Sequence, residues 1–137
     1  MLEKAGIRMK VVKLNQNRDF QRAYRKGKFA AHPLLVTYAV KNRMGENRIG
    51  ITASKKVGNA VKRNRARRVI AAAWNTLQLQ KLKKGYDIVL VARAKTPLAK
   101  STTIAPVLEK HLQKLGLMEH DQKRDAVDDP AVPEISV

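Results

Sequence analysis

The chain has 137 residues, and its 29 lysines and arginines outnumber its 11 aspartates and glutamates, giving a formal net charge of +18. This length is enough for one domain with a modest core. The absence of cysteine excludes disulfides and thiolate metal sites. No apolar run approaches the roughly 18 residues of a membrane span, and the N-terminus lacks the apolar segment of a signal peptide. So large a positive charge favours nucleic acid as partner, before an anionic membrane surface. We therefore expect a soluble, cytoplasmic protein that binds nucleic acid.

The charge is divided unevenly along the chain. Residues 1–118 contain 27 bases and five acids, a net charge of +22, whereas residues 119–137 contain two bases and six acids. The acidic segment also has two prolines and no aromatic residue, a composition typical of disorder. Three parts are predicted: a flexible N-terminal extension at 1–13, an RNA-binding domain at 14–118 and an acidic, disordered tail at 119–137. The tail is either a solvated end or a screen for the basic surface.

The first half of the domain predicts one helix and two strands. The helix is expected at residues 18–26, with Asn17 as its N-cap and Gly27 as its stop. Strands are expected at 34–41 and 48–53. Because the segment between them has turn chemistry, the two strands are predicted to form a β-hairpin.

The second half predicts a long helix at 59–79, an inner strand at 86–93 and a last helix at 101–115, which Ser101 would cap. Strands alternating with helices in this order indicate an α/β fold with helices packed on one sheet. The apolar stripe of the long helix repeats at steps of three and one, as a buried face does. Its members are Ala66, Val69, Ile70, Ala73, Trp74 and Leu77.

The densest basic segment spans residues 55–68, where nine of fourteen positions are Lys, Arg or Asn. A merely solvated helix face normally mixes charges in i,i+4 pairs, but no acid occurs between Glu46 and Asp87. Arginine also forks onto phosphate oxygens with two hydrogen bonds. Binding of a polyanion is therefore favoured. At 100° per residue, the polar positions opposite the stripe or on its flank are Asn64, Arg65, Arg68, Arg63 and Arg67.

Catalysis by the protein itself is not indicated. Hydrolysis of a phosphodiester usually needs clustered carboxylates or a histidine pair, and the acids and histidines here are scattered. Phe20 and Tyr24 share a helix edge that Arg18, Arg22 and Arg25 flank. Aromatic side chains that lie beside basic residues bind single-stranded nucleic acid, because the nucleobases stack on the rings.

The segment 54–68, SKKVGNAVKRNRARR, resembles the signature of the bacterial ribonuclease P protein component, SKK-[IV]-GNAV-x-RNR-x-[KR]-R. The resemblance covers about residues 14–117. It implies an α/β sandwich, a single small domain whose central mixed sheet is packed by helices, like domain 2 of ribosomal protein S5. Supporting residues are Asp19-Phe20, Tyr24, Gly27-Lys28, Tyr38, Arg48-Ile49-Gly50 and Val91-Ala92-Arg93.

The resemblance also implies the function. Ribonuclease P is an endoribonuclease that removes the 5′ leader from precursor tRNA; its RNA subunit cleaves with Mg²⁺, and the protein holds no metal, cofactor or catalytic residue. The positions implied to contact the RNA subunit are Lys55, Lys56, Asn59, Arg63, Asn64, Arg65 and Arg68. Those implied to form the cleft for the single-stranded leader are Phe20, Tyr24, Tyr38, Arg67 and Arg93.

The chain departs from the family pattern at residues 29–33, which replace a segment that commonly bears Asn or Ser. Leu35 stands where an aromatic residue is frequent, so stacking there is expected to be reduced. Three alternatives remain open at this stage. They are a structural ribosomal RNA-binding protein of the same S5-like fold, a stand-alone nuclease, and a general binder of anionic surfaces.

Overall fold

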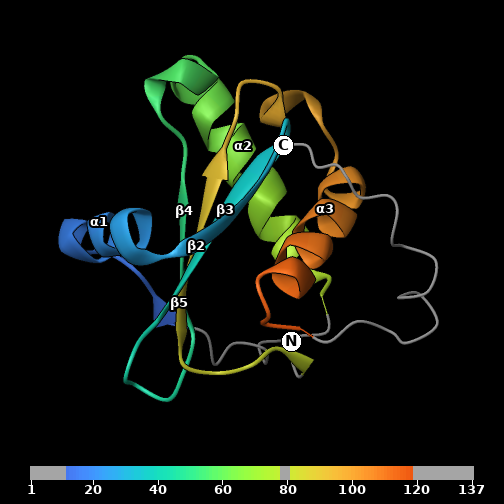
Figure 1. Ribbon diagram of the computed structural model, residues 1–137. Helices are drawn as coiled ribbons and strands as arrows, with labels where there is room; N and C mark the ends of the chain where they lie inside the picture. The colour runs from blue at the N-terminus through green and yellow to red at the C-terminus, as the bar shows by residue number, and fades with distance from the viewer. Residues whose placement is uncertain (1–11, 78–80, 119–137) are drawn as a thin grey trace.

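The computed structural model describes residues 12–77 and 81–118 (Figure 1). The elements follow one another as β1 (Val12–Lys13), α1 (Asn17–Lys26), β2 (Lys28–His32), β3 (Leu35–Lys41), β4 (Arg48–Thr52), the short helix η2 (Lys55–Val57), α2 (Ala60–Asn75), β5 (Tyr86–Ala92), the short helix η4 (Thr96–Leu98) and α3 (Ser101–Lys114). Among these residues, no helix has the length and apolar character that crossing a membrane requires.

The strands form one mixed sheet in the order β1-β4-β5-β3-β2. Strand β5 is central, parallel to β4 and antiparallel to β3. Its middle residues Ile88, Val89 and Leu90 are fully buried, as expected for an inner strand. The chain therefore passes from β4 through α2 to a parallel neighbour, β5.

The predicted hairpin between the strands at 34–41 and 48–53 is wrong, because β5 lies between them. Val89 of β5 pairs with Tyr38 on one side and with Gly50 on the other. The hairpin that does form joins β2 to β3, which are antiparallel neighbours. The sequence does not predict β2, because its five residues, KFAAH, show no apolar alternation.

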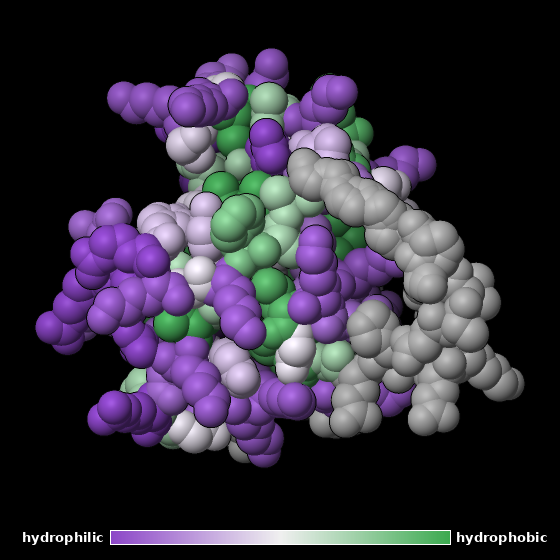
Figure 2. Space-filling model, in the orientation of Figure 1, coloured by the Kyte–Doolittle hydropathy of each residue, from purple (hydrophilic) through white to green (hydrophobic). Residues whose placement is uncertain are grey.

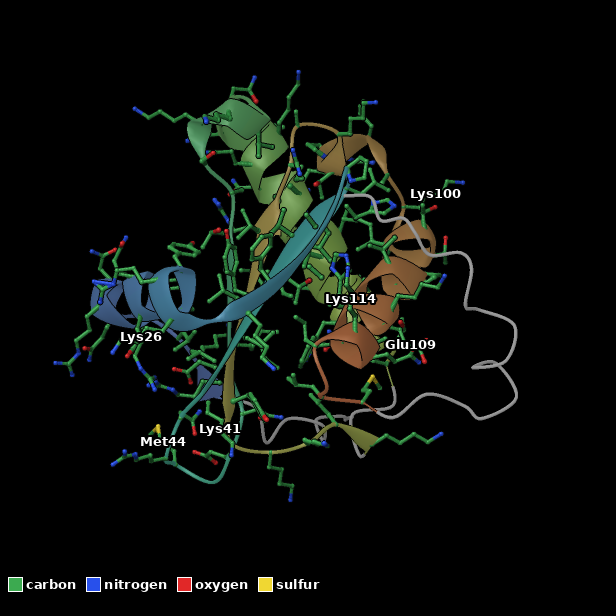
Figure 3. The ribbon with its side chains drawn as sticks, in the orientation of Figure 1. Lys26, Lys41, Met44, Lys100, Glu109 and Lys114 are labelled. Atoms are coloured by element: carbon green, nitrogen blue, oxygen red, sulfur yellow. The ribbon has the colours of Figure 1, made fainter. Side chains whose placement is uncertain are left out.

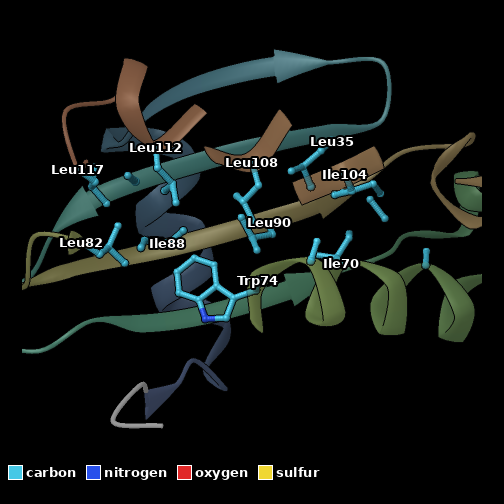
Figure 4. Packing of buried hydrophobic residues seen from close by; sticks show 14 of the residues in the cluster. Leu35, Ile70, Trp74, Leu82, Ile88, Leu90, Ile104, Leu108, Leu112 and Leu117 are labelled. Carbon is cyan, nitrogen blue, oxygen red and sulfur yellow. The ribbon is translucent and has the colours of Figure 1, made fainter. Parts of the chain in front are cut away.

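Helices cover both faces of the sheet (Figure 1). Helices α2 and α3 pack on one face, where they build the main core; Figure 4 shows Ile88 and Leu90 of β5 meeting side chains from both helices. The predicted stripe of the long helix is confirmed, because its six members all belong to this core or pack against it. Burying one such Leu or Ile side chain contributes about 1.5–3 kcal/mol.

Helix α1 lies on the opposite face with a smaller cluster of Leu14, Ala23 and Val89, against which Phe20 and Tyr38 pack. Gly50 makes this close approach possible. A Cβ at Gly50 would lie 2.5 Å from Cε1 of Phe20.

Several predicted boundaries shift. Gln16, not Asn17, is the N-cap of α1, and no side chain caps that helix end. Lys100, not Ser101, is the N-cap of α3. Helix α2 ends at Asn75, before the predicted limit of 79.

The predicted division of the chain into three parts stays a prediction. Val12 and Lys13 belong to the sheet, although they fall within the predicted N-terminal extension. The rest of that extension and the acidic tail lie outside the described residues.

Candidate nucleic-acid interface

The corner between β4 and α2 is shaped by the residues around the basic segment. The Ser54 hydroxyl accepts a hydrogen bond from the Lys56 N–H at 3.3 Å, and Val57 is buried in the main core. Gly58 has φ +141°, in a region that favours glycine. The Asn59 side chain then caps α2 by accepting from the Lys62 N–H at 3.0 Å. This part of the motif is therefore needed for the backbone, and it fixes where the basic residues point.

The basic residues of this corner are mostly exposed. Arg63 donates from Nη1 to the Gly58 carbonyl at 2.9 Å, and Arg65 donates from Nε to the Pro97 carbonyl at 2.7 Å. Each guanidinium has five N–H donors, so both retain groups for a ligand. We call the following set the signature surface: Lys55, Lys56, Asn59, Arg63, Asn64, Arg65 and Arg68.

The electrostatics of the signature surface suit an anion. The first turn of α2 contains no acid, although acids are favourable at the positive end of a helix dipole. Instead Lys62, Arg63 and Arg65 stand in its first two turns. This arrangement costs free energy in the isolated chain, and an anionic partner at the helix N-terminus removes that cost.

Aromatic side chains gather on the other face of the sheet, beside α1. The rings of Tyr24 and Tyr38 lie edge to face, with centroids 5.0 Å apart. The Phe29 ring is 5.7 Å from the Tyr38 ring at an interplanar angle of 33°. Phe29 is 61% exposed and Tyr24 is 36% exposed, so both present ring surface to solvent. We call Tyr24, Phe29 and Tyr38 the aromatic surface; Figure 2 shows hydrophobic surface over β2 and β3 between hydrophilic regions.

Phe29 was not among the residues predicted for this surface. Phe29 and Tyr38 are direct partners across the β2–β3 ladder, and directly opposed residues share a sheet face. The signal was the Pro33-Leu34 turn. Folding the chain back at that turn pairs residue 29 with residue 38.

The structure groups the five predicted cleft residues only in part. Phe20, Tyr24 and Tyr38 meet on the α1 side of the sheet, where Phe20 and Tyr38 are partly buried. Arg93 follows β5 two positions after Val91, so its position alternates onto the same face. Arg67 lies on α2, which packs on the opposite face, and its Nη2 donates to Oδ1 of Asn64 at 3.0 Å. Arg67 thus adjoins the signature surface.

A buried ion pair holds α1 against the sheet. Asp87 is fully buried and accepts two hydrogen bonds from Arg48, at 2.8 and 2.7 Å. These bonds, with further contributions from the charges of Asp87 and Asp19, raise the pKa of Arg48. Arg48 also pairs with Asp19 of α1 at 3.4 Å, and Arg22 of α1 approaches Asp87 to 3.6 Å.

The acids of this domain do not fit a magnesium site. Arg48 occupies the carboxylates of Asp19 and Asp87, and Glu46 and Glu109 are exposed on separate elements. Across residues 12–77 and 81–118, no group of three or more His, Cys, Asp or Glu could hold a metal ion.

The family model of ribonuclease P matches residues 9–116. The chain belongs to the ribonuclease P protein family. The ribonuclease P protein component of Clostridium botulinum strain Langeland is 39% identical over 109 residues, which cover 80% of this chain and 98% of the relative. That of Thermoanaerobacter sp. strain X514 is 35% identical over 117 residues, covering 85% and 100%.

Solved ribonuclease P proteins also share the fold. The Staphylococcus aureus protein is 31% identical and superposes with a TM-score of 0.67, covering 78% of this chain and 97% of that one. The Thermotoga maritima protein is 27% identical with a TM-score of 0.64, covering 74% and 96%. The predicted α/β fold, like domain 2 of ribosomal protein S5, is confirmed.

Family membership decides between the alternatives left open by the sequence. As a ribonuclease P protein, the chain is a subunit of a ribonucleoprotein endoribonuclease of tRNA processing, and ribonuclease P RNA is its partner. The alternative of a structural ribosomal protein is thereby set aside.

Proposed function

We propose that this chain binds the catalytic RNA subunit through the signature surface and the single-stranded 5′ leader of precursor tRNA through the aromatic surface. It thereby assists endonucleolytic removal of the leader. The observation that carries the second part is the exposed ring surface of Phe29 and Tyr24 around Tyr38. Phe29 is exposed next to two further rings, so the three side chains form one continuous aromatic surface that a partner can cover.

The two surfaces suit different forms of RNA. A helix face of exposed lysines and arginines contacts the phosphates of a folded RNA and has little need to read the identity of its nucleobases. Aromatic rings instead accept unstacked bases, which a single strand offers and a duplex does not. The basic residue Arg93 at the end of the aromatic face supplies a charge for the leader backbone.

The leader assignment is tested by Tyr38→Ala in the reconstituted holoenzyme. The variant should weaken binding of leader-bearing precursor by about 1–3 kcal/mol, the range for losing one stacking platform. Binding of mature tRNA, which has no leader, should stay nearly unchanged. Tyr38→Phe keeps the ring and serves as the matched control. An equal loss for both RNAs would show that Tyr38 only supports the fold.

We further propose that the chemistry lies in the RNA subunit, with Mg²⁺ bound there. The carboxylates of this domain support this division of labour, because Arg48 engages both Asp19 and Asp87. Precursor cleavage should be measured at low Mg²⁺ with RNA alone, protein alone and both together. Activity is expected only where RNA is present; cleavage by the protein alone would contradict the proposal. An RNA substrate also favours the cytoplasm as the compartment.

A further inference from the structure

A basic hollow opens at the end of the sheet where β2 turns into β3. Its volume is about 330 Å³, and it is lined by His32, Pro33, Arg93, Ala94 and Lys95. One wall of the hollow is formed by His32 and Pro33 at the β2–β3 turn, and the other wall is formed by residues 93–95, which follow β5. Three of the five lining residues are basic and none is acidic. Of these, only Arg93 belongs to the predicted leader cleft.

The His32 ring is held in one orientation. Its Nδ1 accepts a hydrogen bond from the Leu34 N–H at 3.0 Å, across the two-residue turn. A neutral imidazole that accepts at Nδ1 carries its proton at Nε2. His32 therefore has a fixed N–H donor at its other nitrogen without needing a positive charge.

The electrostatics of the hollow disfavour a further cation. Burial, followed by the positive charge of Arg93, lowers the pKa of His32. The charged or titratable groups around this ring are Arg93 and Lys95 beside it and His111 from α3. Among the described residues, no salt bridge joins Arg93 or Lys95 to an acid. An anion would relieve the mutual repulsion of these groups.

We propose that this hollow binds a phosphate group, supplied by the leader strand that leaves the aromatic surface. The guanidinium of Arg93 suits two phosphate oxygens, Lys95 adds a mobile point charge, and His32 adds an N–H donor. The inference rests on the proposed leader binding, because Arg93 borders both the hollow and the aromatic face. His32 pairs with Leu35 and therefore lies on the α3 face of the sheet, opposite Tyr38 and Phe29. A strand stacked on those two rings would reach the hollow by passing around the end of the sheet at the β2–β3 turn.

The first test uses the full-length chain alone and follows the His32 imidazole by NMR. Its pKa is measured in sodium sulfate, whose charge is constant over the titration, and in sodium chloride of equal ionic strength. A bound dianion favours the charged imidazole, so the pKa should be higher in sulfate. Lys95→Ala should reduce this rise. Lys41→Ala is the matched control, because Lys41 is exposed at the far end of β3 (Figure 3).

The result that overturns anion binding is an identical pKa of His32 in the two salts. A rise that Lys95→Ala and Lys41→Ala reduce equally would also overturn it. In that case the effect would come from the general charge of the chain rather than from the hollow.

The second test uses the holoenzyme and precursors with leaders of increasing length. Lys95→Ala should weaken binding several-fold only beyond the length at which the leader reaches the hollow. It should also reduce the salt slope of log K by about one unit or less. Lys41→Ala should change neither quantity.

The leader series separates this inference from the proposed function. If Tyr38→Ala lowers leader affinity while Lys95→Ala matches Lys41→Ala at every length, the leader is not the source of the phosphate. A positive sulfate result would then assign the hollow to free phosphate. If Tyr38→Ala also fails to discriminate leader-bearing from mature tRNA, the proposed leader surface itself is wrong.

Discussion

The signature surface and the aromatic surface differ in how the chain assembles them. The signature surface comes from one stretch, residues 55–68, in which a helix cap and a glycine corner set the direction of α2. The aromatic surface takes Tyr24 from α1, Phe29 from β2 and Tyr38 from β3. Its geometry depends on strand register and on the seating of α1.

This difference predicts different sensitivities. A local surface survives as long as its helix stays folded on the core. An assembled surface is lost when any one of its supporting elements moves. Substitutions that remove the ion pairs between α1 and the sheet should therefore weaken leader binding more than binding of the RNA subunit.

The largest effect is expected from Asp87→Asn, which leaves Arg48 without its buried partner. Removing one member of a buried ion pair costs about 3–5 kcal/mol, and partial exposure of Arg48 favours the lower end. The free energy of unfolding should be measured with urea. In variant protein that remains folded, leader binding should fall more than binding of the RNA subunit.

Glu46→Gln removes the same charge from an exposed position and is the control for Asp87→Asn. Its free energy of unfolding should stay within about 0.5 kcal/mol of the parent value. Equal losses of leader and RNA-subunit binding in folded Asp87→Asn would show that α1 does not position the aromatic surface independently.

Acidification should instead weaken both surfaces together, because His111 of α3 is buried against Thr37 of β3 and its protonation lowers the stability of the whole domain. The His111 ring is buried and its Nδ1 is 2.8 Å from the Thr37 hydroxyl. Burial, with smaller effects of His32 and Lys114, lowers its pKa to about 4. A lowered pKa means that the unfolded chain binds a proton first. Stability is therefore full above pH 6.5 and is lost as the pH falls towards 4.

Between pH 7 and pH 5 this group should remove about 2 kcal/mol from the free energy of unfolding. Urea unfolding at the two pH values measures the loss. His111→Gln cannot titrate, so its stability should change less over this interval. A variant with the parent's pH dependence would assign the effect to other groups.

The sequence predicted most of what depends on local periodicity. The stripe of α2, the exposed side of its basic face and the central position of β5 follow from spacing and hydropathy. The pairing of Arg48 with Asp87 joins residues 39 apart and was beyond any local pattern. The same is true of Phe29, since only the β2–β3 register brings it to Tyr38. The wrong hairpin arose because a turn between two strands does not exclude a third strand from entering between them.

Phe29→Ala tests the assembled surface at its most exposed member. The ring is largely in solvent, so truncation should change the free energy of unfolding by less than about 0.5 kcal/mol. Binding of leader-bearing precursor should weaken by about 1 kcal/mol, the low end for one base–aromatic stack. Mature tRNA should bind as before. A clear loss of stability would mean that Phe29 acts through packing on Tyr38.

The smallest effects are expected from single arginines of the signature surface, and two neighbours there separate RNA contact from support of the fold. Arg68 is exposed, whereas Arg65 also ties α2 to η4 through the Pro97 carbonyl. Arg68→Ala and Arg65→Ala should each weaken binding of the RNA subunit and flatten the salt slope of log K by about one unit or less. Only Arg65→Ala should also lower the free energy of unfolding, by about 1 kcal/mol for the lost hydrogen bond.

The loss of RNA-subunit affinity in these two variants should not depend on leader length, because a phosphate contact on the signature surface is independent of the aromatic surface. Unaltered RNA-subunit affinity in Arg68→Ala would move the contact face of α2 away from that side of the helix.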